Sequence, residues 1–177
     1  MNLLILRPSD ALANGVITLN DYRAEHLIKV IKVVIGSRIQ VGELNGNTGT
    51  ATVTAIDGKA VTLQVEPLTA PPPNTLPCDL LLALPRPRMF QRSLQTLATM
   101  GVEHIHLLHT ERVEKSFWQT PLLKDSAIEE NLLLGLEQAK ATQMPKVSFY
   151  KRWPDVKALI MSLNQPQKII AHPGNYP

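Results

Sequence analysis

The chain has 177 residues, of which 44% are hydrophobic and 19% charged, and its net charge is +3. This apolar fraction excludes a wholly disordered chain, and the length allows one medium domain or two small ones. The single cysteine, Cys78, excludes an intramolecular disulfide framework and a cysteine-based metal cluster. No apolar run approaches the roughly 20 residues that span a bilayer, and no signal peptide is recognisable at the start. We therefore expect a cytoplasmic protein with no membrane partner.

Short β-like runs alternate with turn signals in the first part of the chain. Three such runs lie at 38–41, 51–56 and 60–65. Asp57-Gly58 separates the last two, and an Asp-Gly pair between alternating runs is a strong hairpin signal. One helix is expected near 21–34, where four apolar residues keep helical spacing. These are Leu27, Val30, Ile31 and Val34. The patterns predict a small β-barrel-like domain over residues 1–70.

A proline-rich stretch follows this part. Residues 71–77 hold four prolines, which cannot continue a helix and favour an extended conformation. We expect this stretch to be a linker between two domains.

The hydrophobic period changes after the linker. Strands are expected at 79–84, 102–108, 147–150 and 168–171, and helices at 89–100, 126–142 and 154–163. The continuous apolar run at 79–84 is typical of a strand buried on both faces. The alternation predicts a mainly parallel α/β sheet over residues 78–177, within a chain that is α+β overall. Because the chain ends directly after a buried-type strand, we expect that a continuation is missing.

Arg86 and Arg88 flank Pro87 between the first strand of this sheet and its helix. Guanidinium groups bind phosphate through paired hydrogen bonds, and a helix N-terminus adds partial positive charge. The loop is therefore a candidate RNA contact. A solvated loop with surface arginines is the alternative.

The segment 109–118 follows the second strand, and ligands of open α/β sheets bind beyond the carboxyl ends of the strands. Arg112 and Lys115 are candidates for contacts with RNA phosphate, and Phe117 or Trp118 for stacking on a base. The alternative is a surface ion pair beside aromatic residues that cover the core.

A basic set recurs at helical spacing in the first domain: Arg23, His26, Lys29 and Lys32. It is either an RNA-binding stripe or a solvated helix face. His104 and His106 alternate in a strand, but without a nearby cysteine or a helical His-Glu pair they do not indicate a metal site.

Two further pairs have open interpretations. Glu137 and Gln138 lie within an otherwise apolar helix, where they either form hydrogen bonds across an interface or make up its polar face. His172 and Pro173 follow the last expected strand, where they either shape a cofactor pocket or form a turn.

Several of these pieces occur together, in order, in one family. The stretches are His26-Leu27-x-x-Val30-x-Lys32, 82–89, Leu97-x-x-Met100-Gly101-Val102, 111–118, 135–139 and 171–174. Over essentially its whole length the chain resembles the bacterial small-subunit ribosomal RNA uracil-N3 methyltransferases, the RsmE family.

The resemblance implies a PUA-like RNA-binding β-barrel followed by a SPOUT-type methyltransferase domain. It implies a homodimer that binds S-adenosylmethionine and methylates a uridine at N3 in 16S ribosomal RNA, without a metal. It also implies RNA contacts for the basic residues named above, a cofactor contact for His172 and Pro173, and a family-motif position for Glu137 and Gln138. The catalytic base is unknown.

The sequence departs from the family in one major respect. The Gly-Pro-Glu-Gly-Gly and Leu-Arg-x-Glu-Thr segments, which supply the knot and most of the cofactor pocket, do not occur in it. We therefore expect the 177-residue chain alone to be inactive. The alternatives to a methyltransferase are a noncatalytic RNA-binding module and an inactive truncated remnant.

Overall fold

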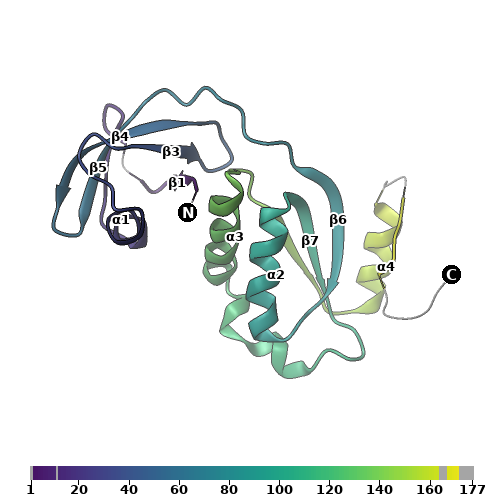
Figure 1. The fold of residues 1–177 in the computed structure, drawn as a ribbon. Helices are drawn as coiled ribbons and strands as arrows, with labels where there is room; N and C mark the ends of the chain where they lie inside the picture. Colours follow the sequence, from purple (N-terminus) through teal and green to yellow (C-terminus); the bar gives the residue numbers. More distant parts are fainter. Residues whose placement is uncertain (1, 11, 164–166, 172–177) are drawn as a thin grey trace.

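A computed structural model describes residues 2–10, 12–163 and 167–171, and these form two sheets joined by an extended segment (Figure 1). The first sheet has five strands in the order β1-β3-β4-β5-β2. β1 is parallel to β3, and the other pairs are antiparallel, so the sheet is mixed. Its strands are β1 (Leu4–Leu6), β2 (Val16–Leu19), β3 (Arg38–Glu43), β4 (Thr48–Asp57) and β5 (Ala60–Val65).

The hairpin expected at Asp57-Gly58 is confirmed. Asp57 pairs with Ala60 across the turn, and Gly58 adopts a φ of 57°, a conformation that glycine reaches without strain. β1 and β2 were not predicted from the sequence. Their signals are the apolar run Leu3–Leu6 and the Asn14-Gly15 turn that precedes β2.

The helix of the first domain differs from the prediction. A short α1 (Tyr22–His26) continues as one π-helical turn, η1 (Leu27–Ile31), and ends where Lys32 turns left-handed at φ 58°. Of the four residues expected on its buried face, only Leu27 is buried, whereas Val30 and Val34 are 64% and 66% exposed. A π-helical turn closes i to i+5 hydrogen bonds, so side chains leave the 3.6-residue period on which the prediction rested.

The second sheet is wholly parallel, as the alternation of elements predicts. Its order is β6-β7-β8, and its strands are β6 (Leu76–Ala83), β7 (Val102–Leu108) and β8 (Lys146–Tyr150). Two helices cover one face and a third lies on the other (Figure 1). They are α2 (Pro87–Thr99) and α3 (Asp125–Ala139) on the first face and α4 (Trp153–Ser162) on the second. Two 3₁₀ turns, η2 (Lys115–Gln119) and η3 (Pro121–Leu123), precede α3.

Two expectations for this domain are wrong. β6 is an edge strand and is only half-buried along its apolar run, because a strand with one neighbour keeps part of its surface in water. Residues 168–171 do not form a strand, and Ile169 and Ile170 are 79% and 91% exposed. Residues 168–171 have side chains that favour a strand, but they pair with no strand of the described residues. Strand formation depends on such pairing.

The two sheets share a contact region. Leu3 and Ile5, from the first strand region of the chain, are buried in the same core cluster as α2, α3 and β7. The backbone N–H groups of Asn2 and Leu3 both donate to the carbonyl oxygen of Glu137, at 3.0 Å. None of the described helices is long and apolar enough to cross a membrane.

Candidate functional site

The carboxyl ends of β6, β7 and β8 meet at one edge of the second sheet, where α2 and α3 also begin (Figure 1). Ligands of parallel α/β sheets bind in the loops at this edge, because the strands end there together and helix N-termini point at it. The candidate site is built from three connections, which are 84–86, 109–114 and 151–152.

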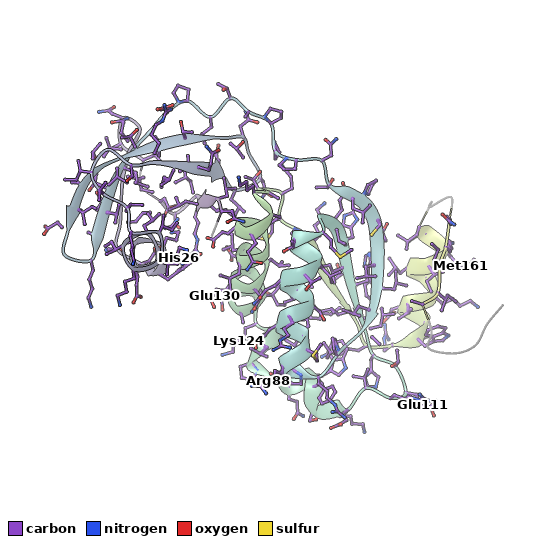
Figure 2. All side chains as sticks on the ribbon, in the orientation of Figure 1. His26, Arg88, Glu111, Lys124, Glu130 and Met161 are labelled. Carbon is purple, nitrogen blue, oxygen red and sulfur yellow. The ribbon has the colours of Figure 1, made fainter. Side chains whose placement is uncertain are left out.

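Arg86 and Arg88 lie at the start of α2. The carbonyl oxygen of Arg86 accepts backbone hydrogen bonds from Met89 and Phe90, each 2.9 Å long, which starts the helix. Both arginine side chains are exposed, and neither pairs with a carboxylate of the described residues. Arg88 and Lys124, the residue before α3, are labelled at the same end of α2 and α3 in Figure 2. The two guanidinium groups are thus available to an anion.

Arg112 and Lys115 follow β7 in the same edge. Both are exposed and, within the described parts of the chain, neither forms an ion pair. Val113 between them is buried in the core and anchors the loop, so the two cations point outward from a fixed backbone. The edge therefore presents at least four exposed cations that form no ion pair with the described residues, a feature that favours a polyanion such as RNA.

Aromatic residues of this edge are less accessible than stacking on a base requires. Phe117 and Trp118 are half-buried and pack against the core cluster. The Lys151 ammonium lies 5.2 Å from the centroid of the Trp118 ring, and the Phe149 ring meets Trp118 edge-on at 6.2 Å. The indole N–H of Trp118 donates to Nδ1 of His109 at 2.9 Å. The Trp118 ring is thus engaged by its own neighbours.

His109 and Lys151 were not identified as site residues from the sequence. The available signal is positional: each is the first residue after a strand of the same parallel sheet, β7 and β8 respectively. Such residues gather at the carboxyl edge whatever their separation along the chain.

Arg23 does not belong to an exposed basic stripe, and the expectation that it contacts RNA is corrected. Its side chain is 3% exposed and makes ion pairs with Asp10 at 2.7 Å and Asp21 at 2.8 Å. It also donates to the carbonyl oxygen of Ile5 at 2.8 Å. Burial opposes ionisation of Asp10, but hydrogen bonds from Arg23 and Arg7 outweigh it and lower the pKa of Asp10. Arg23 therefore joins β1 to α1 inside the first domain.

The other three residues of the basic set differ in their exposure and in their ion pairs. Lys29 is exposed and pairs with Glu25 at 2.6 Å, and Lys32 is exposed at the left-handed end of η1. His26 is half-buried, and burial lowers its pKa. A surface hollow of about 390 Å³ beside α1 is lined by Tyr22 and Lys29, among others.

Glu137 lies where the two domains meet, whereas its neighbour Gln138 is exposed. Glu137 is 3% exposed and accepts a 2.9 Å hydrogen bond from the hydroxyl of Tyr22, which itself accepts one from Arg7 at 3.1 Å. Burial raises the pKa of Glu137, and burial together with the Glu137 charge raises the pKa of Tyr22 to about 12. The arrangement holds a carboxyl group between the domains and away from the carboxyl edge.

The other candidates have the following places. His172 and Pro173 lie outside the described residues. His104 and His106 both approach one oxygen of Asp79, at 3.2 and 2.9 Å, and the described residues contain no cluster of three or more potential metal ligands. The described residues do not define a cofactor pocket at this edge.

Two family models match the chain. Residues 19–66 match an RNA methyltransferase PUA domain, and residues 72–176, more than half of the chain, match an RNA methyltransferase domain. The two matches follow the two sheets in order.

Two curated proteins are similar in sequence. Ribosomal RNA small subunit methyltransferase E of Treponema pallidum is 28% identical over 149 residues, which cover 84% of this chain and 56% of that protein. Ribosomal RNA small subunit methyltransferase E 1 of Borreliella burgdorferi is 28% identical over 171 residues, 96% of this chain and 70% of that protein. The chain thus spans little more than half of the first of these relatives.

Solved structures share the fold. A Legionella pneumophila protein in complex with the cofactor SAM has a TM-score of 0.69 and 18% identity, covering 97% of this chain and 70% of that one. Ribosomal RNA small subunit methyltransferase E of Neisseria gonorrhoeae, bound to S-adenosyl methionine, has a TM-score of 0.63 and 20% identity, covering 85% and 62%. The solved structures show the shared fold, and the domain matches show that the chain belongs to the family of RNA methyltransferases that carry a PUA domain before the methyltransferase domain, as do its similarities to two ribosomal RNA small subunit methyltransferases E.

Proposed function

We propose that the protein transfers a methyl group from S-adenosylmethionine to N3 of a uridine in 16S ribosomal RNA. The observation that carries the proposal is the match of one chain to a PUA domain and an RNA methyltransferase domain, in that order. The names of its curated relatives point to small-subunit ribosomal RNA as the substrate, and two other proteins of the same fold, solved with bound S-adenosylmethionine, point to this cofactor.

The exposed cations of the carboxyl edge, Arg86, Arg88, Arg112 and Lys115, are proposed to bind the RNA backbone. Each phosphate neutralised by a cation releases bound counterions, so such contacts supply affinity without sequence preference. On the first domain, Lys29, Lys32 and His26 are proposed as additional contacts, without Arg23.

The cofactor, when bound, supplies a methyl group on a sulfonium that is already a good leaving group. The protein then has to position the base and help remove its N3 proton. His172 and Pro173 are proposed at the edge of the cofactor site, and Gln138 and Glu137 at an interface. No described residue is assigned as the base.

The partners proposed are the small ribosomal subunit and a second copy of the chain. The location proposed is the cytoplasm, where ribosomal subunits are assembled. The domain division proposed is 1–70, 71–77 and 78–177. The gap between Val65 at the end of the first sheet and Leu76 at the start of the second supports a linker here, although Leu76 and Pro77 already belong to β6.

Methyl transfer tests the proposal directly. The product of the full open reading frame that contains this chain is incubated with methyl-labelled S-adenosylmethionine and small ribosomal subunits from cells that lack this modification, and the RNA is then digested and analysed by mass spectrometry. We expect one labelled 3-methyluridine, whereas subunits that already carry the modification accept no label. RNA binding without any methyl transfer would contradict the proposal and favour the second candidate, a noncatalytic RNA-binding module, which the unpaired cations of the carboxyl edge also suit.

A further inference from the structure

His109 is held rigidly at the carboxyl edge. Its backbone N–H donates to the carbonyl oxygen of Tyr150 at 2.9 Å, so the ladder between β7 and β8 continues one residue past Leu108. Side chains alternate along a strand, so His109 lies on the same face as Ile105 and Leu107, the face that α2 and α3 cover. The imidazole is half-buried, with its position set by the sheet rather than by a free loop.

Trp118 determines which nitrogen of His109 carries the proton. The indole Nε1–H donates to Nδ1 of His109 at 2.9 Å, and an indole nitrogen can only donate. Nδ1 must therefore accept, and in the neutral ring the proton is on Nε2. The contact converts an imidazole with two possible tautomers into a hydrogen-bond donor of fixed position.

Trp118 is itself held in place. Its ring packs against the core cluster, meets the ring of Phe149 edge-on, and has the Lys151 ammonium 5.2 Å from its centroid. An ammonium over an indole face is an attractive arrangement. Lys151 thus helps to hold the indole in place.

We propose that His109 recognises the uracil base, with its Nε2–H donating to the O4 keto oxygen. Uracil O4 is a hydrogen-bond acceptor, whereas cytosine carries an N4 amino group, a donor, at the same position. An Nε2–H donor that cannot change tautomer forms a hydrogen bond with uracil O4 and is repelled by the amino group of cytosine. The inference rests on the proposed function, which places a uridine at this edge. It adds His109 as the residue that selects the base.

Binding of two single-stranded RNAs tests the selection. Fluorescein-labelled ten-nucleotide oligouridine and oligocytidine are titrated with the chain, at one salt concentration, by fluorescence anisotropy. Wild type should bind oligouridine about three to ten times more tightly, the range that one net hydrogen bond provides. His109→Ala should abolish the preference, by weakening the binding of oligouridine and by relieving the opposition of the imidazole donor to the cytosine amino group.

Trp118→Phe keeps an aromatic ring but removes the indole donor, and it should weaken the preference because Nδ1 is no longer held as an acceptor. Trp153→Phe is the matched control. Trp153 is 65% exposed at the start of α4, and its replacement should leave the preference unchanged.

A second measurement is independent of RNA. Nitrogen-15 shifts of the His109 ring in the free protein should show the Nε2–H tautomer, and the Nδ1–H tautomer would overturn the inference. Equal binding of both RNAs by wild type would also overturn it, and leaves methyl transfer, the test of the proposed function, unaffected. A selective protein that transfers no methyl group would contradict the proposed function alone, and failure to bind either RNA by a protein that still methylates ribosomal subunits would overturn the inference alone.

Discussion

Glu137 has a carboxyl group with little access to water, and this burial determines its pKa and its effect on stability at different pH. It accepts a hydrogen bond from Tyr22 across the domain boundary, yet burial raises its pKa because the charged form has lost hydration. In the unfolded chain the group ionises near its ordinary value of 4.5. Between that pH and the raised pKa of the native state, the folded protein binds more protons than the unfolded one. The free energy of unfolding contributed by Glu137 therefore falls as pH rises through this window.

Glu137→Gln should remove this dependence. Glutamine keeps an oxygen that accepts from Tyr22 but cannot ionise, so the variant should gain stability relative to wild type as pH rises above about 4.5. Urea unfolding from pH 4 to pH 8 measures the difference. Glu129→Gln, at an exposed position of the same helix, is the matched control and should show no such gain. A difference between Glu137→Gln and wild type that stays constant over this range would contradict the assignment.

At the level of elements, α2 and α3 are in unusually close contact at one glycine. A Cβ added to Gly135 would lie 2.3 Å from the carbonyl oxygen of Gln95 and 2.8 Å from Cβ of Ala98. The hydroxyl of Thr99 donates to the carbonyl oxygen of Gly135 at 3.2 Å, so the helices are also joined by a hydrogen bond. The Gly135 position is thus required by packing rather than by its backbone angles.

Gly135→Ala should therefore destabilise the protein, although alanine is the better helix former. The methyl group meets backbone atoms that cannot move without separating the helices, and overpacking of this kind costs about 1–3 kcal/mol. Chemical denaturation measures the loss. Thr96→Ala, on the exposed side of α2, should change stability by less than about 0.5 kcal/mol. A neutral or stabilising Gly135→Ala would show that the helices can separate freely.

The two exposed arginines at the start of α2 should contribute to RNA affinity and to its dependence on salt. Replacing both Arg86 and Arg88 by alanine should lower RNA affinity and reduce the slope of log affinity against log salt by about 1.4, since each lost phosphate contact on a single strand accounts for about 0.7. A salt series of RNA titrations measures the slope. Lys140→Ala with Lys146→Ala removes two exposed cations outside this edge and should leave the slope unchanged. An unchanged slope in the arginine variant would place RNA elsewhere on the protein.

For the whole molecule, the decisive contacts lie between the two sheets. Thr142 is fully buried, and its hydroxyl donates to the carbonyl oxygen of Gly46 at 2.6 Å. The carbonyl oxygen of Thr142 accepts from the backbone N–H of Asn45, and the side chain of Asn45 accepts from the N–H of Met144, both at 2.8 Å. Together with Leu3 and Ile5 in the second core, these bonds couple the domains.

Thr142→Val tests this coupling. Valine has nearly the same shape but cannot donate, so the carbonyl oxygen of Gly46, which is only part-buried, would lose its partner, at a cost of about 0.5–1.5 kcal/mol. Thermal or urea unfolding measures the change, and protease cleavage within 71–75 should become faster as the domains separate more often. Thr142→Ser retains the hydroxyl and should recover most of the bond. Equal stability of the Val and Ser variants would show that this bond does not couple the domains.

Local pattern predicted much of the fold. The bounds of β7 agree with the expected strand, and the hairpin between β4 and β5 and the parallel order of the second sheet are confirmed. Each of these features depends on residues close together in the chain, through turn preference or the period of apolar side chains. The clustering of Arg86, Arg88, Arg112 and Lys115 at one edge also follows from strand order alone.

Other features depended on partners far apart in the sequence. Arg23 has the spacing of a surface cation, but Asp10 and the carbonyl oxygen of Ile5 enclose it. His109 and Lys151 come together only because β7 and β8 are neighbours in the sheet. The sequence by itself determined the two-part architecture and the basic carboxyl edge, because apolar periodicity and strand order are local properties. Only the tertiary structure decided which cations remain free and which tautomer His109 adopts, because burial and hydrogen bonding depend on residues that folding brings together.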